Sequence, residues 1–357
     1  MRGPFVRSWH RRLWLATLLA ASASIACRQD ATEPSLTGAP APAVIASPNL
    51  STALTAQGRY TENLLAKPGI VGTGVGLTAA GKPAVKVFTR TPDATGIPTS
   101  LDGVPVEVVV TGEITSLPAV RGAADFTVAV APSDIYARPV PIGVSTGNEG
   151  TCSSGTIGAR VKAGNKIYAL SNNHVYALEN QAPLGSRILQ PGRYDLNCAT
   201  AGADKRLGSL TKFVPVVFSK TASNVVDAAI ALTSTSMLDR GTPPDGYGIP
   251  SATPVAPAVG MPVQKYGKTS KLTVGWVDAI NATITVTYNT GTTRFVKQIL
   301  IAARGPFCRA GDSGSLIVTT AGRQPVGLLF AGTSSGYTFA NPIGDVLKAF
   351  NVSIDGT

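Results

Sequence analysis

Short apolar runs separated by turn residues dominate the chain from residue 141 to its C-terminal end. Runs of this length, rich in Val, Ile and Thr and bounded by Gly, Pro, Asn or Ser, predict β-strands. The expected strands are 156–162, 166–171, 214–218, 226–232, 273–280, 283–288, 295–301, 314–319 and 325–331. Helical patterns are scarce, and one occurs at 342–350. We therefore expect a mainly β domain over 141–357, built as a sandwich or as a pair of β-barrels.

A smaller α/β unit is predicted upstream, over residues 57–115. One helix is expected at 52–66, and it is followed by strands at 70–77, 83–89 and 105–111. Within the first of these strands, Gly72, Gly74 and Gly76 form a G-x-G-x-G string. A dinucleotide-binding loop would place these glycines between a strand and a helix. Here they lie inside a strand that leads into another strand, so a close-packed strand is the better interpretation.

Residues 1–27 have the pattern of a signal peptide: several arginines, then the apolar run 13–25, then small residues before Cys27. The apolar run is short for a membrane span. A cysteine directly after alanine is typical of a bacterial lipoprotein, in which that cysteine is acylated; a plain secretory signal is the alternative. Residues 28–56, rich in Pro, Ala, Thr and Ser, are expected to form a flexible linker. Residues 116–140 contain three prolines and are expected to be a connector.

Composition excludes several classes of protein. Charged residues make up 14% of the chain, below the ~25% of an average globular protein, which favours an exported β protein over a coiled coil or a helical bundle. The net charge is +11, but the basic residues form no run, so we expect no nucleic-acid surface. The cysteines lack C-x-x-C spacing, and one histidine outside the signal cannot complete a zinc set. We expect neither a metal nor a cofactor.

Three residues far apart in the sequence suggest nucleophilic catalysis. His174 is the single histidine outside the signal and follows a predicted strand, while Ser313 lies in the sequence Gly-Asp-Ser-Gly-Ser. A serine hydroxyl needs a neighbouring base, usually imidazole, and a carboxylate must hold the imidazole tautomer. Asp227 offers that carboxylate, because it is a lone acid in an apolar run whose burial requires a strong partner. The chain order His174, Asp227, Ser313 is that of the chymotrypsin type.

These motifs resemble those of chymotrypsin-fold (trypsin-like) serine peptidases. The similar stretches are 173–175, 227–231, 266–270, 274–277, 311–315, 326–332 and 339–342. More closely, 156–162, 169–175, 189–195 and the preceding small unit resemble a bacterial, often exported, group related to the plant narrow-leaf trypsin-like proteins. The resemblance implies a chymotrypsin-like double β-barrel, preceded here by the small α/β domain, with the site in the cleft between the barrels.

The resemblance also implies a role for each residue of the site. Ser313 would attack the substrate carbonyl carbon, and His174 would accept and return the proton. Asp227 would orient His174. The backbone N–H groups of Gly311 and Ser313 would form an oxyanion hole, in which two donors stabilise the negative oxygen of the intermediate.

The substrate-binding strand implied by the resemblance consists of Phe330, Ala331 and Gly332. Phe330 stands where the family usually has a serine close to the catalytic aspartate. Phe307 replaces the acid of trypsin-type pockets, so a preference for Arg or Lys is not expected. Trypsin-like enzymes need a freed N-terminus, and no obvious activation site precedes Cys152.

Three cysteines follow the signal, so one disulfide is the natural count in an oxidising compartment. Cys152 and Cys198 flank His174 almost symmetrically. In the resembled fold a disulfide commonly brackets the histidine loop in this way, which implies the pair Cys152–Cys198 and leaves Cys308 outside it. The competing pair is Cys152–Cys308, which would tie the serine loop to the first strand.

The expected function is therefore an exported serine endopeptidase that acts on protein or peptide substrates. It would contact the membrane through a lipid on Cys27 alone and reside in the bacterial cell envelope, or be secreted. The alternative class is a catalytically silent envelope binding module that reuses the fold. Intact His174, Asp227 and Ser313 favour the enzyme, because drifted copies usually lose one of the three.

Overall fold

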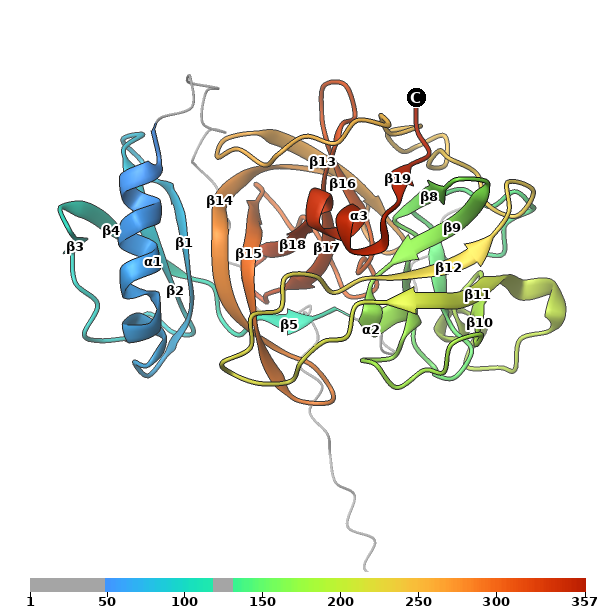
Figure 1. The fold of residues 1–357 in the computed structure, drawn as a ribbon, viewed down its shortest axis with the longest axis horizontal. Helices are drawn as coiled ribbons and strands as arrows, with labels where there is room; N and C mark the ends of the chain where they lie inside the picture. The colour runs from blue at the N-terminus through green and yellow to red at the C-terminus, as the bar shows by residue number, and fades with distance from the viewer. Residues whose placement is uncertain (1–48, 118–130) are drawn as a thin grey trace, which may run out of the picture.

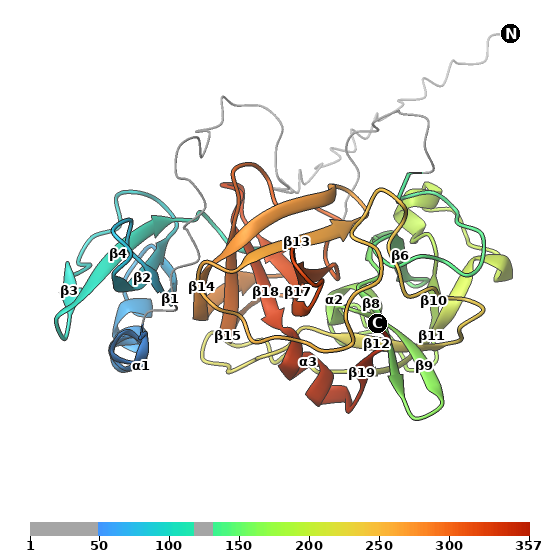
Figure 2. The same cartoon turned by 90° about the horizontal axis from the view of Figure 1, so that it is seen from above.

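The computed structural model describes residues 49–117 and 131–357. Three parts lie along the long axis of the molecule (Figure 1): a small α/β unit, a first curled sheet formed by strands within 262–342, and a second curled sheet formed by strands within 145–233 and 353–354. The same arrangement is visible from above in Figure 2. The expected signal peptide, Cys27 and the linker up to residue 48 lie outside the described residues.

The larger sheet has 11 strands and includes the strands of the small unit. Its order is β13-β16-β17-β18-β15-β14-β1-β2-β4-β3, and β5 pairs with both β14 and β17. The strands are β1 (Ile70–Leu77), β2 (Pro83–Thr89), β3 (Ser100–Leu101), β4 (Val104–Val110), β5 (Thr115–Ser116), β13 (Pro262–Gly267), β14 (Lys271–Thr287), β15 (Thr292–Ala302), β16 (Leu316–Thr319), β17 (Pro325–Gly332) and β18 (Thr338–Pro342). Helix α1 (Ser51–Leu65) packs on β1 and β2.

The second sheet has 8 strands in the order β19-β8-β9-β12-β11-β10-β6-β7. They are β6 (Ser145–Asn148), β7 (Gly155–Thr156), β8 (Ala159–Ala163), β9 (Lys166–Ser171), β10 (Arg187–Leu189), β11 (Arg206–Phe213), β12 (Ala229–Thr233) and β19 (Ser353–Ile354). The helices of this half are α2 (Asn173–Tyr176), α3 (Ile343–Phe350) and two 3-10 turns, Arg193–Leu196 and Ala203–Lys205. The mainly β prediction is confirmed, and the two curled sheets correspond to the expected double β-barrel.

The small unit is joined to the first curled sheet by backbone pairing. Strand β1 lies between β2 and β14, so one sheet runs through both parts. A Cβ on Gly72 would lie 2.8 Å from side-chain atoms of both Ile284 and Phe88. The G-x-G-x-G string therefore belongs to a tightly packed strand, as the sequence indicates. Lys86 on β2 adds an ion pair, 2.7 Å from Asp278 on β14.

Buried polar contacts join the two curled sheets. Lys268, in the turn between β13 and β14, lies 2.8 Å from a carboxylate oxygen of Asp195 in the first 3-10 turn, and both side chains are almost fully buried. Thr156 on β7 donates its N–H to the carbonyl of Ser313. Its hydroxyl donates to the carbonyl of Gly311 at 2.9 Å. These bonds fix the loop around Ser313 against the opposite sheet.

Three expectations about elements need correction. Helix α1 begins at Ser51, so the end of the expected linker, 51–56, is helical. Residues 214–218 form no strand, because the side chains of Asn180 and Asn224 take the backbone hydrogen bonds that a neighbouring strand would provide. The two strands expected over 273–288 are one strand, β14, whose register shifts between residues 277 and 284.

No described helix is long and apolar enough to cross a membrane.

Candidate active site

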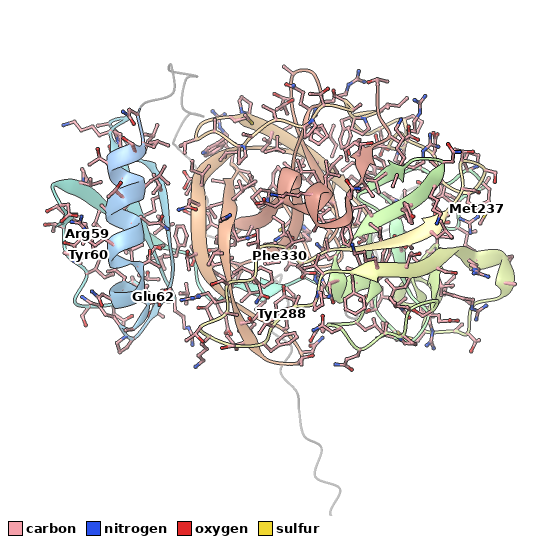
Figure 3. All side chains as sticks on the ribbon, in the orientation of Figure 1. Arg59, Tyr60, Glu62, Met237, Tyr288 and Phe330 are labelled. Carbon is pink, nitrogen blue, oxygen red and sulfur yellow. A yellow bond between two sulfur atoms is a disulfide. The ribbon has the colours of Figure 1, made fainter. Side chains whose placement is uncertain are left out.

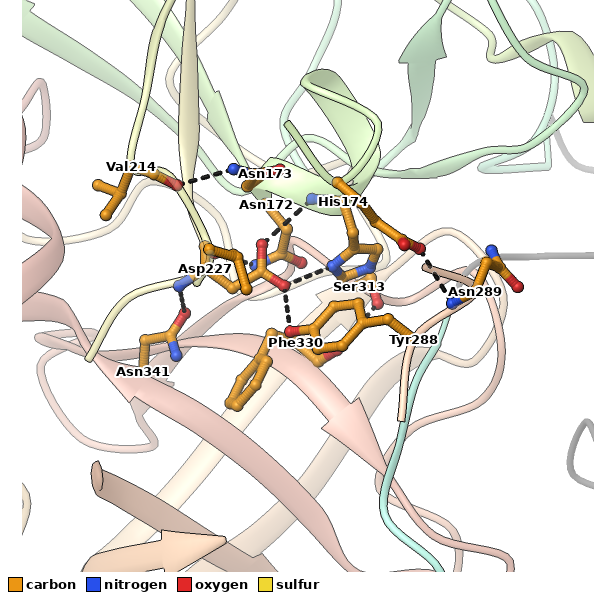
Figure 4. Close-up of polar contacts among 12 residues, drawn as sticks. Asn172, Asn173, His174, Val214, Asp227, Tyr288, Asn289, Ser313, Phe330 and Asn341 are labelled. Carbon is orange, nitrogen blue, oxygen red and sulfur yellow. Dashed lines mark hydrogen bonds and ion pairs between the residues drawn. The ribbon is translucent and has the colours of Figure 1, made fainter. Parts of the chain in front are cut away.

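The structure brings His174, Asp227 and Ser313 together where the two curled sheets meet (Figure 4). His174 lies on the short helix α2, directly after β9, and Asp227 lies just before β12. Because β9 and β12 are neighbours in the sheet, their ends bring the two side chains into contact. The ring Nδ1 of His174 lies 2.7 Å from Asp227 Oδ2, and the His174 backbone N–H donates to Oδ1 at 3.2 Å. Asp227 has no exposed surface.

Further polar groups surround the Asp227 carboxylate and backbone. The hydroxyl of Tyr288 donates to Asp227 Oδ2 at 2.7 Å. Burial, together with the nearby Asp227 carboxylate, raises the pKa of Tyr288 well above its ordinary value, so the hydroxyl remains a donor. The Asp227 N–H donates to the Asn341 side chain, and its carbonyl accepts from Asn172. A buried carboxylate needs such partners, because an unpaired one is costly.

Ser313 lies in a backbone turn that requires glycine at the next position. Gly314 has φ +95°, and a Cβ there would lie 2.3 Å from the Thr156 carbonyl oxygen and closer still to the hydroxyl of Ser171. The Ser313 hydroxyl donates to the carbonyl of Phe330 at 3.4 Å. Nε2 of His174 is buried and has no hydrogen-bond partner among the described residues. The imidazole thus presents an unpaired nitrogen, while its other nitrogen is fixed by Asp227.

Asp312, next to Ser313, is fixed from the side of β13. Its carboxylate lies 3.5 Å from Lys265 Nζ, and neither side chain has exposed surface. It also accepts hydrogen bonds from the backbone N–H groups of Arg309, Thr269 and Ser270 and from the Ser270 hydroxyl. Burial lowers the pKa of Lys265, and the Asp312 charge opposes that shift. Asp312 is therefore paired with Lys265 and accepts hydrogen bonds from three residues of the neighbouring loops.

The expected oxyanion donor Gly311 has a partner in this structure. Its backbone N–H donates to the carbonyl oxygen of Leu117 at 2.8 Å. Leu117 comes directly after β5, which runs antiparallel to the end of β17, the strand that ends in Ala331 and Gly332. Residues of the small unit's C-terminal end therefore lie against the expected substrate strand.

Cys152 and Cys198 form a disulfide with Cα atoms 5.1 Å apart, which is the pairing that the resemblance implies. Cys308 is buried outside this disulfide and accepts a hydrogen bond from Thr338. Among residues 49–117 and 131–357, no cluster of three or more His, Cys, Asp or Glu side chains could hold a metal ion.

Tyr288 and Leu117 belong to the site, but neither of them carried a usable signal in the sequence. Phe330, which stands in place of the family's serine, is fully buried, and its ring centroid lies 4.9 Å from that of Phe295. The hydroxyl near Asp227 comes instead from Tyr288, which directly follows β14 and is labelled in Figure 3. Leu117 lay in an expected connector. Both Tyr288 and Leu117 reach the site through long-range packing, which local sequence patterns do not reveal.

Comparison with known proteins gives structural neighbours alone. No family model matches the chain, and no curated protein matches it. Among solved structures, Thermobifida fusca protease A aligns over 61% of this chain and 100% of its own, with 19% identity and a TM-score of 0.43. A glutamic-acid-specific serine protease aligns over 60% and 100%, with 19% identity and a TM-score of 0.41. Cellulomonas bogoriensis chymotrypsin aligns over 61% and 99%, with 21% identity and a TM-score of 0.40.

Proposed function

We propose that the chain is a serine endopeptidase in which Ser313 is the nucleophile. The observation that carries this proposal is the buried pair of His174 and Asp227, whose Nδ1 and Oδ2 atoms are 2.7 Å apart, with Ser313 beside His174 in Figure 4. A carboxylate that accepts from Nδ1–H fixes the tautomer whose Nε2 can take a proton from serine. The unpaired Nε2 of His174 is consistent with that role.

The proposed reaction has two half-reactions. Ser313 Oγ bonds to the carbonyl carbon of the substrate while its proton moves to His174 Nε2. The amide C–N bond then breaks, and His174 gives the proton to the departing amine. Water, deprotonated by His174, attacks the acyl carbon; the ester bond to Ser313 Oγ then breaks, and His174 returns the proton to that oxygen as the acid leaves. The N–H groups of Gly311 and Ser313 would stabilise the oxyanion in both halves, a contribution of about 10²–10³ in rate for each donor.

Turnover of activated peptide esters tests this proposal. Ser313→Ala and His174→Ala should each lower turnover by roughly 10⁴-fold or more, leaving the residual rate that substrate binding and the oxyanion donors provide. Asp227→Asn should cost about 10⁴-fold, because the amide favours the wrong tautomer. Circular dichroism spectra that match the wild type would exclude unfolding as the cause. If wild-type turnover equals that of Ser313→Ala and a fluorophosphonate modifies Ser313 in no variant of the protein, the catalytically silent binding module is the better interpretation.

We also propose export and lipid anchoring through Cys27, on the basis of the signal pattern alone. One acyl chain binds membranes only marginally, so stable anchoring requires a second. The mature protein should begin at Cys27 and sediment with membranes, and Cys27→Ser should release it. A soluble mature protein that begins several residues later would contradict this proposal.

A further inference from the structure

The segment that ends the small unit lies in the position of an extended peptide. Strand β5 pairs antiparallel with β17, with Ser116 opposite Ala331 and Thr115 opposite Gly332. Extended peptides commonly bind proteins by adding a strand to a sheet in this way, with pockets for selected side chains. Strand β17 contains Phe330, Ala331 and Gly332, the residues expected to bind the substrate backbone.

The carbonyl of Leu117 occupies the expected oxyanion site. It accepts the N–H of Gly311 at 2.8 Å, two residues before Ser313. A carbonyl held by this donor is in the place of the carbonyl that a nucleophilic serine would attack. Backbone pairing at residues 115–116 and the oxyanion contact at Leu117 therefore place three consecutive residues as a substrate would lie.

The side chain of Leu117 fills an apolar pocket beside the serine loop. It is 4% exposed and belongs to one apolar cluster with Phe307 and Cys308. A Cβ on Gly332 would lie 2.8 Å from Leu117 Cδ1, so glycine at that position leaves the space that the leucine takes. Lys265 Nζ lies 5.8 Å from the centre of the Phe307 ring. Lys265 is paired with Asp312 at 3.5 Å, so this apolar pocket disfavours a charged side chain of either sign.

Hydrogen bonds also hold the residues just before this segment. The Thr111 carbonyl accepts from the Ser335 hydroxyl at 2.6 Å, and the Ile114 carbonyl accepts from the Thr287 N–H at 2.9 Å. Strand β4 ends at Val110 and β5 begins at Thr115, so only a short connection separates the small unit from the strand that pairs with β17. Such a tether gives an effective concentration of roughly millimolar or more. Ser313 has no exposed surface with the segment in place.

We propose that Thr115, Ser116 and Leu117 occupy the place of the substrate residues that precede the scissile bond. It follows that the site takes peptides with a medium aliphatic side chain, such as leucine, at the residue whose carbonyl is attacked. It also follows that the chain restrains its own activity until this segment leaves. This inference rests on the proposed function.

The rate at which a fluorophosphonate modifies Ser313 tests the occupancy. Leu117→Glu places a carboxylate in the apolar pocket, which should expel the segment and raise the rate by roughly tenfold or more. Leu184→Glu is the matched control, because Leu184 is 64% exposed and should leave the rate unchanged. Thr115→Pro is a second variant, which acts by removing a backbone N–H of the added strand.

A peptide added in trans checks that faster labelling comes from an emptied site. The peptide of residues 112–117 should slow the labelling of Leu117→Glu, and the same peptide ending in glutamate should not. Tripeptide nitroanilides ending in leucine, phenylalanine or lysine should be hydrolysed by Leu117→Glu in the order leucine, phenylalanine, lysine.

Each outcome decides between the two proposals. Equal labelling rates in the wild type, Leu117→Glu and Thr115→Pro would overturn the occupancy and leave the proposed function standing. A preference for lysine would overturn the assigned substrate class. No labelling of Ser313 in any variant would overturn the proposed function, and this inference with it.

Discussion

Asp227 is the residue on which the geometry of the site depends. It has no exposed surface, and its carboxylate accepts from the His174 backbone, the His174 ring and the Tyr288 hydroxyl. Hydrogen bonds to a charged group are worth about 1.5–3 kcal/mol each. In the proposed mechanism Tyr288 would act as a positioning residue, because its hydroxyl donates to the carboxylate that would orient His174.

Tyr288→Phe should lower kcat about 10- to 100-fold with little change in KM, because one donor to a buried carboxylate is lost. The measurement is peptide hydrolysis in the Leu117→Glu background, with circular dichroism to check folding. Tyr60→Phe is the matched control, since Tyr60 also donates to a carboxylate, that of Asp102, but on the exposed side of the small unit. An unchanged kcat in Tyr288→Phe would show that the His174 pair suffices.

Lys265→Met should destabilise the protein by about 3–5 kcal/mol, because it removes one partner of a buried ion pair and leaves Asp312 uncompensated. Urea unfolding measures this loss. The double variant with Asp312→Asn should recover part of the stability, since the buried charge is then gone. Arg59→Met removes an exposed partner of Asp102 and should change stability little. A Lys265→Met variant as stable as the wild type would mean that the backbone N–H donors alone satisfy Asp312.

At the level of elements, the sequence predicts best those strands whose burial and turns agree. The expected strands 70–77, 83–89 and 166–171 match β1, β2 and β9, because each is an apolar run that ends at a turn. Strand β14 continues through Asn281, whose φ is +51°, and no turn forms there because β15 and β1 hold both sides. Residues 214–218 have strand-like composition, but asparagine side chains take their backbone hydrogen bonds.

In the site, too, residues with a local or chemical signal were predictable, and residues placed by long-range packing were not. His174, Asp227 and Ser313 were predictable because their chemistry restricts the residue types and their chain order is specific. Tyr288 and Leu117 were not, because an aromatic residue at a strand end and a leucine in a connector have many packing roles. Only the paired sheets bring the Tyr288 hydroxyl to Asp227 and the backbone carbonyl of Leu117 to Gly311.

The disulfide closes a loop that contains β9 and α2, the elements that carry His174. With a sequence separation of 46, the chain-entropy model gives a contribution of about 4 kcal/mol at most. Cys198→Ser should lower the free energy of unfolding by up to that amount in denaturant titrations. Reduced wild type should show the same loss. If neither differs from the oxidised wild type, the loop is constrained by its other contacts.

At the scale of the whole molecule, the small unit and the two curled sheets form one connected system. The sheet runs from β3 through β1 and β14 to the strands around Ser313, and β5 returns from the small unit to β17 (Figure 1). The position of residues 115–117 is thus set by the docking of the small unit on β14. Under the proposed occupancy, this arrangement would couple access to Ser313 to a part of the chain that contributes none of His174, Asp227 and Ser313.

The most direct measurement is the mass-spectrometric location of a fluorophosphonate adduct on the full chain. Phosphorus should be bonded to Ser313 Oγ, with fluoride displaced, in the Leu117→Glu variant first and in the wild type more slowly. His174→Ala should abolish the adduct, because nothing then accepts the serine proton. An adduct on another residue, or no adduct in any of the three proteins, would contradict the assignment of Ser313 as an activated nucleophile.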